Sequence, residues 1–175
     1  PDLFNAIAEA VCARDPEMSF VVSPWLYKIH ELDFEENREI VRRLLAAARG
    51  RRVLWDLHVE GDKLSHAHDT ERFIPAIRAY IDAIDPENQI QFCILEENGL
   101  KHHMERALGH AHMINTIERM GGVVAVDCAA NCLQAWQQND NGWDQGQLFY
   151  TPTGWWGMPP YYSQQMIARH QPVGV

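Results

Sequence analysis

Two adjacent carboxylates, Glu96 and Glu97, stand at the end of the apolar run Ile90–Leu95 and are followed by Asn98 and Gly99. This pattern predicts a strand that leads into a helix through an acidic turn. In α/β barrels, catalytic side chains lie at the C-terminal ends of the strands. Side chains alternate along a strand, so at most one of the two carboxylates points into a site there. The alternative is a solvated acidic loop that caps the following helix.

A second strand end carries histidines. The segment WDLHVEGD contains His58, and His66 and His68 follow it. Together with the nearby acidic residues they could bind zinc or another divalent metal. His58 could instead face a pocket carboxylate or a sugar hydroxyl, or be an ordinary loop histidine. The run crosses a glycine loop, so we expect no face on which three ligands converge and predict no metal.

A third segment with residues that could bind a ligand, NDNGWDQG, contains Trp143 and Gln145 among asparagine and aspartate residues. Aromatic rings stack on the apolar faces of sugars, and amides and carboxylates bind their hydroxyl groups. The segment therefore suits a carbohydrate, although a turn with a half-buried tryptophan would read the same way.

Alternating strands and helices must position these groups. Four strands and six helices are expected, which predicts an α/β fold with a parallel sheet and outer helices. The expected strands are Met18–Val22, Val53–Leu57, Ile90–Leu95 and Gly146–Tyr150, and the expected helices are Asp2–Arg14, Asp33–Arg49, Asp69–Ile84, Leu100–Met120, Val123–Leu133 and Pro159–His170. We find no repeat and no linker, so one continuous stack of β/α units is expected.

Composition narrows the class of partner. The chain has 175 residues, a net charge of −9 and no Lys/Arg-rich block, which argues against nucleic acid or an anionic membrane as the main partner. No apolar run approaches the roughly 20 residues that span a bilayer. The four cysteines lie in apolar surroundings, so buried thiols are expected rather than a disulfide framework. Pro1 stands in the approach to a helix, which suggests that more sequence precedes it.

Several segments resemble, in order, the family-51 glycoside hydrolases, the α-L-arabinofuranosidases. The segment LEENGLKHHMERALGHAHMINTIER resembles their nucleophile strand and the helix after it, WDLHVEG resembles the preceding strand, and GWDQGQLFYTP resembles the final one. The segments NCLQAWQQNDNGWDQG and PPYYSQQMIARHQP resemble the same region of bacterial members. The resemblance implies strands five to eight, roughly the second half, of a (β/α)8 barrel.

The resemblance also implies roles for individual residues. Glu97 would be the nucleophile of a retaining glycosidase, with Glu96 facing away. His58, Trp143, Gln145 and Asn98 would bind the arabinofuranosyl unit of an arabinose-containing glycan, and no cofactor is implied. Asn98 stands where the family has an aromatic residue.

By the resemblance, the general acid/base would lie at the end of strand four, which we expect upstream of Pro1. A retaining glycosidase needs both carboxyl groups about 5–5.5 Å apart. We therefore expect the chain to pair with the missing half of the barrel or with a second copy, and to lack activity alone. Two alternatives stay open. One is a metal-dependent hydrolase using His58, His66 and His68, and the other is a carbohydrate-binding half-barrel without catalysis.

Overall fold

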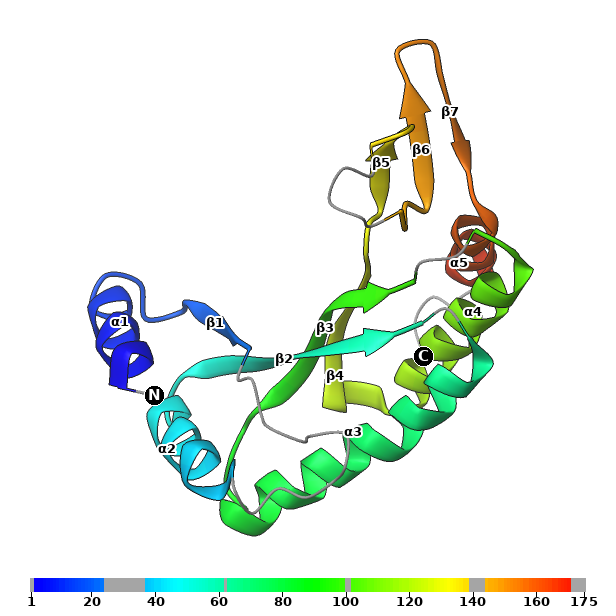
Figure 1. Ribbon diagram of the computed structural model, residues 1–175. Helices are drawn as coiled ribbons and strands as arrows, with labels where there is room; N and C mark the ends of the chain where they lie inside the picture. The colour runs from blue at the N-terminus through cyan, green and yellow to red at the C-terminus, as the bar shows by residue number, and fades with distance from the viewer. Residues whose placement is uncertain (1, 24–36, 62, 100–101, 139–143, 171–175) are drawn as a thin grey trace. The chain divides into compact units, whose positions relative to one another are not determined.

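The computed structural model describes residues 2–23, 37–61, 63–99, 102–138 and 144–170 (Figure 1). Its helices are α1 (Asp2–Cys12), α2 (Arg38–Ala48), α3 (Leu64–Ile84), α4 (Met104–Arg119) and α5 (Pro159–His170), with a short 3-10 helix at Gly121–Val123. Its strands are β1 (Ser19–Val22), β2 (Arg52–Glu60), β3 (Gln91–Asn98), β4 (Val124–Ala129), β5 (Leu133–Ala135), β6 (Leu148–Thr151) and β7 (Gly154–Gly157). None of the described helices is long and apolar enough to cross a membrane.

The main sheet has four strands in the order β1-β2-β3-β4, each a neighbour of the next along the chain (Figure 1). β1 and β2 run parallel, with Ser19 opposite Arg52 and Val22 opposite Trp55. Helices connect β1 to β2, β2 to β3 and β3 to β4. The predicted α/β class, with a parallel sheet of β/α units, is confirmed. The closure of these units into half of a barrel stays a prediction.

The fourth strand of this sheet was misplaced by the sequence analysis. The segment Val123–Leu133, predicted to be helical, contains β4 and the start of β5. The strand expected at Gly146–Tyr150 is β6, which pairs parallel with β5 and antiparallel with β7 in a separate three-stranded sheet. Short apolar runs fit helix and strand equally well, and the β-branched valines at the start of this run favour a strand.

Contacts divide the chain into two compact units, Pro1–Asp56 with Arg72–Cys93 and Leu57–Glu71 with Ile94–Val175. In the first unit, apolar residues of α2, α3 and the first halves of β2 and β3 form the core. Trp55 packs edge-on against Phe92, with ring centroids 6.2 Å apart, and both side chains are fully buried. This core holds the first halves of β2 and β3 within the first unit.

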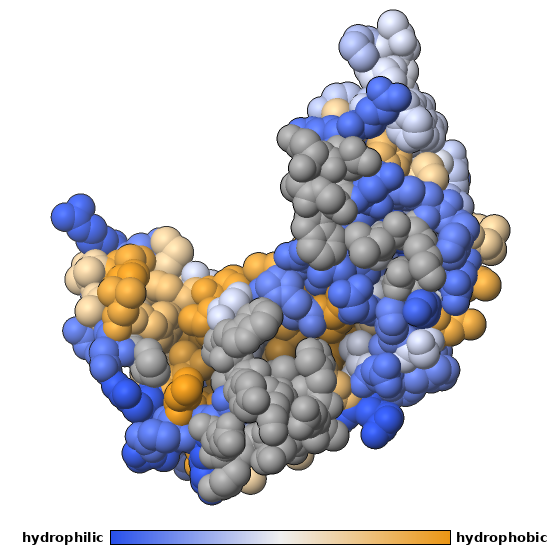
Figure 2. Space-filling model, in the orientation of Figure 1, coloured by the Kyte–Doolittle hydropathy of each residue, from blue (hydrophilic) through white to orange (hydrophobic). Residues whose placement is uncertain are grey.

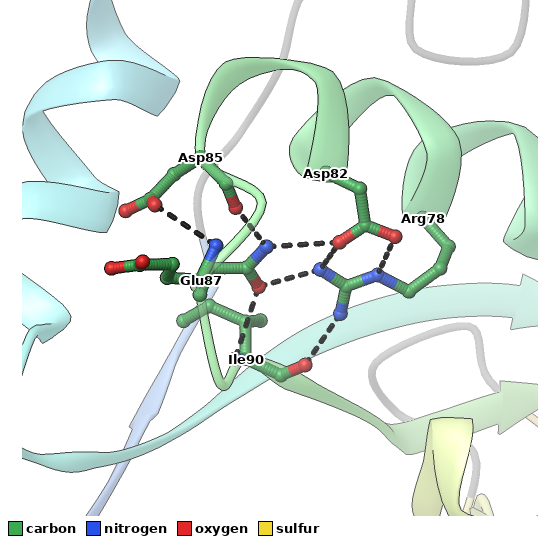
Figure 3. A network of polar contacts seen from close by, with 6 residues as sticks. Arg78, Asp82, Asp85, Glu87 and Ile90 are labelled. Carbon is green, nitrogen blue, oxygen red and sulfur yellow. Dashed lines mark hydrogen bonds and ion pairs between the residues drawn. The ribbon is translucent and has the colours of Figure 1, made fainter.

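A polar network holds the turn between α3 and β3 in the first unit (Figure 3). The Arg78 guanidinium donates to the Ile90 carbonyl oxygen at 2.6 Å and, through Nε, to Asp82 Oδ2 at 3.1 Å. Asp85 Oδ1 accepts from the backbone N–H of Glu87 at 3.2 Å. The network therefore ties the last turns of α3 to the first residue before β3.

Two large apolar side chains of α1, Leu3 and Ile7, are exposed. Leu3 is 74% exposed and Ile7 is 49% exposed, whereas Ala8 is fully buried. Apolar surface is correspondingly visible over α1 (Figure 2). The helix expected over Asp2–Arg14 is therefore present as α1, and its apolar face is largely uncovered in the described part of the chain.

Candidate functional site

The candidate site lies in the second unit, where β3 continues to Asn98 and so carries both carboxylates within the strand. Glu96 Oε2 lies 3.1 Å from His58 Nε2 on the neighbouring strand β2. Both of these side chains are about half exposed, at 43% and 47%. Glu97 contacts a different element, the helix α4, through His110. The two adjacent carboxylates therefore have separate environments, one open and one enclosed.

Glu97 is enclosed, as expected for a carboxylate that faces the interior. The expected contact of Glu97 with His58 and Gln145 stays a prediction, and the contact that the structure gives His58 is with Glu96. The Glu97 side chain is only 2% exposed and both of its oxygens contact His110. Alternation along a strand predicts that neighbouring side chains diverge, but does not say which of them meets the helix layer.

Glu97 and His110 form a buried ion pair. His110 Nδ1 lies 2.8 Å from Glu97 Oε1 and 2.7 Å from Oε2. His110 Nε2 lies 3.2 Å from Gln164 Oε1 on α5 and 3.2 Å from Gln147 Nε2 before β6. Burial alone would lower the pKa of His110, but the hydrogen bond and the negative charge of Glu97 outweigh it, and the pKa is raised. The imidazolium form donates through Nδ1 to Glu97 and through Nε2 to Gln164.

Two glycines make room for this pair. A Cβ at Gly61 would lie 1.8 Å from Glu97 Oε1, and a Cβ at Gly109 would lie 2.9 Å from the Gly61 carbonyl oxygen. The backbone N–H of Gly61 also donates to the Asn98 carbonyl oxygen at 2.7 Å. The loop after β2 therefore packs directly against the end of β3, and α4 packs directly on that loop.

Asp127 on β4 lies beside this pair. Burial, together with the negative charge of Glu97, raises the pKa of Asp127 to about 7, and the positive charge of His110 offsets part of the rise. Its Oδ1 atom is buried and has no hydrogen-bond partner within the described ranges. Asp127 therefore titrates near neutral pH in the folded protein and near pH 4 when unfolded.

This difference predicts a pH-dependent effect of Asp127→Asn. The unfolded chain loses the Asp127 proton first as pH rises, so wild-type stability falls between about pH 4 and pH 7 and then levels off. Asparagine cannot ionise, so the gain of the variant relative to wild type should rise with pH, from about 1–2 kcal/mol at pH 5 to about 4 kcal/mol by pH 8. Urea unfolding at several pH values measures the gain. Asp69→Asn, at an exposed carboxylate, is the control, and a difference between Asp127→Asn and wild type that stays constant with pH would contradict the assignment.

Of the other predicted sugar-binding residues, Asn98 and Gln145 lie at and near the end of β3. The Asn98 side-chain oxygen is buried and has no hydrogen-bond partner among the residues that the structure describes. Gln145 is buried, and its Oε1 accepts from the Gly99 N–H at 3.5 Å, while its carbonyl oxygen accepts from Arg106 at 2.7 Å. Gln145 therefore helps to hold the turn after β3. Trp143 lies outside the described residues.

The three histidines of the alternative metal site are not brought together. His58 lies against Glu96, while His68 lies 3.9 Å from Glu71 and its ring packs on His112 at 4.8 Å. His66 and His68 belong to α3, which begins five residues earlier than predicted. Within the described ranges, no group of three or more His, Cys, Asp or Glu residues is arranged to hold a metal ion.

The sequence analysis missed His110 and Asp127. A signal for His110 exists in the sequence, because Ala107, His110, Met113 and Ile117 share one stripe of α4 and all are buried. A histidine within an apolar stripe needs a polar partner on the surface that the stripe covers. Asp127 had no such signal, because its segment was assigned to a helix.

These elements, a parallel sheet of β/α units with polar side chains at the strand ends, match part of a domain in solved structures of glycoside hydrolases. The particular solved structures that the chain resembles are family 51 arabinofuranosidases. One is the enzyme from Bifidobacterium longum, with a TM-score of 0.67 and 11% identity over 95% of this chain and 40% of that one. Another is the enzyme from Xanthomonas axonopodis pv. citri, with a TM-score of 0.58 and 10% identity over 78% of this chain and 33% of that one.

The similarity confirms the resemblance at the level of the fold. The chain spans between one third and two fifths of the length of these solved structures. No family model and no curated protein matches its sequence. At 10–11% sequence identity, the similarity shows that the architecture is shared but does not show that the site residues correspond.

Proposed function

We propose that this chain is part of a retaining glycoside hydrolase that releases α-L-arabinofuranosyl residues, with Glu96 rather than Glu97 as the nucleophile. The observation that carries the proposal is the half-exposed Glu96–His58 pair at the C-terminal ends of two adjacent strands. The fold shared with part of the family 51 arabinofuranosidases supplies the substrate class. The resemblance in sequence matched Glu97 to the nucleophile, and a shift of one position in that match gives the role to Glu96.

Accessibility decides between the two carboxylates. A nucleophile must reach the anomeric carbon of the sugar, at about 3–3.5 Å before attack. Glu96 is 43% exposed, whereas Glu97 is 2% exposed and bonded through both oxygens. Moving Glu97 to a substrate would leave a charged His110 buried without its counter-ion, which is strongly unfavourable.

The chemistry follows from a carboxylate in this position. Glu96 attacks the anomeric carbon and forms a glycosyl ester as the leaving group departs, and water then hydrolyses the ester. His58 holds Glu96 in place, since its Nε2 lies within hydrogen-bond distance of the carboxylate. The side-chain oxygen of Asn98 is buried without a partner among the described residues, so it is suited to accept a hydrogen bond from a sugar hydroxyl. Trp143 and Gln145 stay proposed as further sugar contacts.

The second carboxyl group completes the mechanism. The resemblance implies an acid/base on the fourth barrel strand, and we propose that it comes from the remaining half of the barrel. An arabinose-containing oligo- or polysaccharide is the proposed partner.

Covalent capture tests the proposal without the acid/base. The reagent is a 2-deoxy-2-fluoro-α-L-arabinofuranoside that carries dinitrophenolate as its leaving group. Dinitrophenolate departs without being protonated, so formation of the covalent intermediate needs only the nucleophile. We expect one equivalent of dinitrophenolate and, by peptide mass spectrometry, a sugar on Glu96. Glu60→Gln, at an exposed carboxylate on β2, is the control and should label normally.

Two results would overturn this assignment. A sugar on Glu97 would restore the role first matched to that residue. No labelling at any ligand concentration would favour a carbohydrate-binding half-barrel without catalysis.

A further inference from the structure

The Glu97–His110 pair has no part in the proposed chemistry, yet both of its side chains are enclosed in the second unit. Its side chains are 2% and 3% exposed. The groups that meet at His110 come from β3, α4, α5 and the segment before β6, through Glu97, Gln164 and Gln147. Four segments therefore converge on His110, the partner of the residue that follows the proposed nucleophile.

We propose that Glu97 and His110 are positioning residues that fix the end of β3 and thereby hold Glu96 against His58. This inference rests on the proposed function, in which Glu96 is the nucleophile. Glu97 follows Glu96 directly in the strand, so a displacement of the anchored residue moves the backbone of its neighbour.

Backbone contacts on both sides of β3 hold Glu97 and the next residue, Asn98. The Glu97 carbonyl oxygen accepts from the Ala130 N–H at 3.0 Å, and the Asn98 carbonyl oxygen accepts from the Gly61 N–H at 2.7 Å. The side-chain pair supplies a third tie, toward α4 and α5, which lie side by side (Figure 1). The strand end is thus held in three directions while Glu96 stays open.

Simple filling of the core does not explain this arrangement. A buried ion pair stabilises a fold little compared with apolar residues of similar volume. Here the carboxylate also requires Gly61, since any Cβ there would lie 1.8 Å from Glu97 Oε1. A directional contact of this kind suits an active site, because a displacement of a reacting group by about 1 Å lowers the reaction rate roughly 10²-fold.

Glu97→Gln and Gly61→Ala test the proposal. Glu97→Gln keeps the shape and removes the charge, and Gly61→Ala keeps the charge and displaces the carboxylate. The capture reagent described above gives the rate of labelling of Glu96 and the concentration for half-maximal rate. We expect both variants to lower the maximal rate about 10- to 100-fold with little change in the half-maximal concentration. Adding Glu97→Asp to Gly61→Ala makes room for the new methyl group and should restore part of the rate.

NMR of the His58 ring supplies a readout that needs no activity. Both variants should shift the His58 ring signals, and Glu96→Gln marks the shift expected when the contact is lost. Asp85→Asn is the matched control, because it breaks the Arg49–Asp85 pair in the first unit and should leave labelling and the His58 signals unchanged.

The outcomes separate the two proposals. If both folded variants label Glu96 at the wild-type rate and leave the His58 signals in place, the pair is only structural and the inference is wrong. If the wild type itself is never labelled, the proposed function is wrong, and the NMR comparison still decides if the pair positions Glu96. Should Glu97→Gln unfold, Gly61→Ala with its Glu97→Asp partner gives the same test.

Discussion

Glu96→Gln is expected to lower the hydrolysis of dinitrophenyl α-L-arabinofuranoside by on the order of 10⁴-fold or more, the loss seen when a covalent nucleophile is removed. An amide cannot form the glycosyl ester, and the activated leaving group ensures that the missing step is nucleophilic attack. The half-exposed position of Glu96 means that the substitution should leave the fold intact. Release of dinitrophenolate under single-turnover conditions measures the loss.

Azide provides the complementary result. In Glu96→Ala the space left by the carboxylate admits azide, which attacks the anomeric carbon from the same side and releases a β-L-arabinofuranosyl azide with inverted configuration. Glu97→Gln should instead lose about 10- to 100-fold and give no azide product, because its nucleophile is present but misplaced. Glu96→Gln activity within tenfold of wild type would sink the assignment of Glu96.

Local patterns in the sequence determined a large part of this fold. The strand ahead of Glu96 and Glu97 is strongly apolar and breaks at Asn98-Gly99, so its existence followed from composition alone. The last helix, Pro159–His170, was predicted with the bounds that the structure gives, because a proline in the first turn marks its start. β4 was not predicted, since a run such as VVAVDCA has no period that separates a buried strand from a helix.

The location of the candidate site could be predicted from the sequence, but the side chains that contact Glu96 and Glu97 could not. The sequence placed two carboxylates at one strand end and a histidine at the next, and the structure brings Glu96 and His58 within 3.1 Å. The choice between Glu96 and Glu97 depends on a contact with another element. His110, which lies on α4, 13 residues after Glu97, forms a hydrogen bond with Glu97. Such a contact depends on how α4 docks, which no local pattern of the strand encodes.

The resemblance to a family helped with the fold more than with the residues. At 10–11% identity a motif of three residues can be matched in two registers that differ by one position. Both registers put an acid in the nucleophile position here, because Glu96 and Glu97 are adjacent. Burial and hydrogen bonding separate the two choices where similarity in sequence does not.

Glu97→Ala is expected to destabilise the protein by about 3–5 kcal/mol, the cost of breaking a buried pair by removing one partner. His110 would stay buried at 3% exposure, without the carboxylate that raises its pKa. The melting temperature should fall by roughly 6–20 °C for a domain of this size. Glu96→Ala, which removes a half-exposed partner, should cost only about 0–1 kcal/mol and is the control.

The pH dependence of this loss identifies its cause. The pKa of His110 is raised in the folded protein, so the pair contributes its full stabilisation below pH 6.5 and loses it as pH rises through the folded pKa. The cost of Glu97→Ala, measured by urea unfolding, should therefore be larger at pH 6 than at pH 9. A double variant, Glu97→Gln with His110→Gln, replaces the charges by amides that can bond to each other, and should lose less than Glu97→Ala at pH 6. If Glu97→Ala lowers the free energy of unfolding by less than about 1 kcal/mol at pH 6, the carboxylate is not the buried partner of His110 in solution. The proposed anchoring of β3 beside Glu96 would then be wrong.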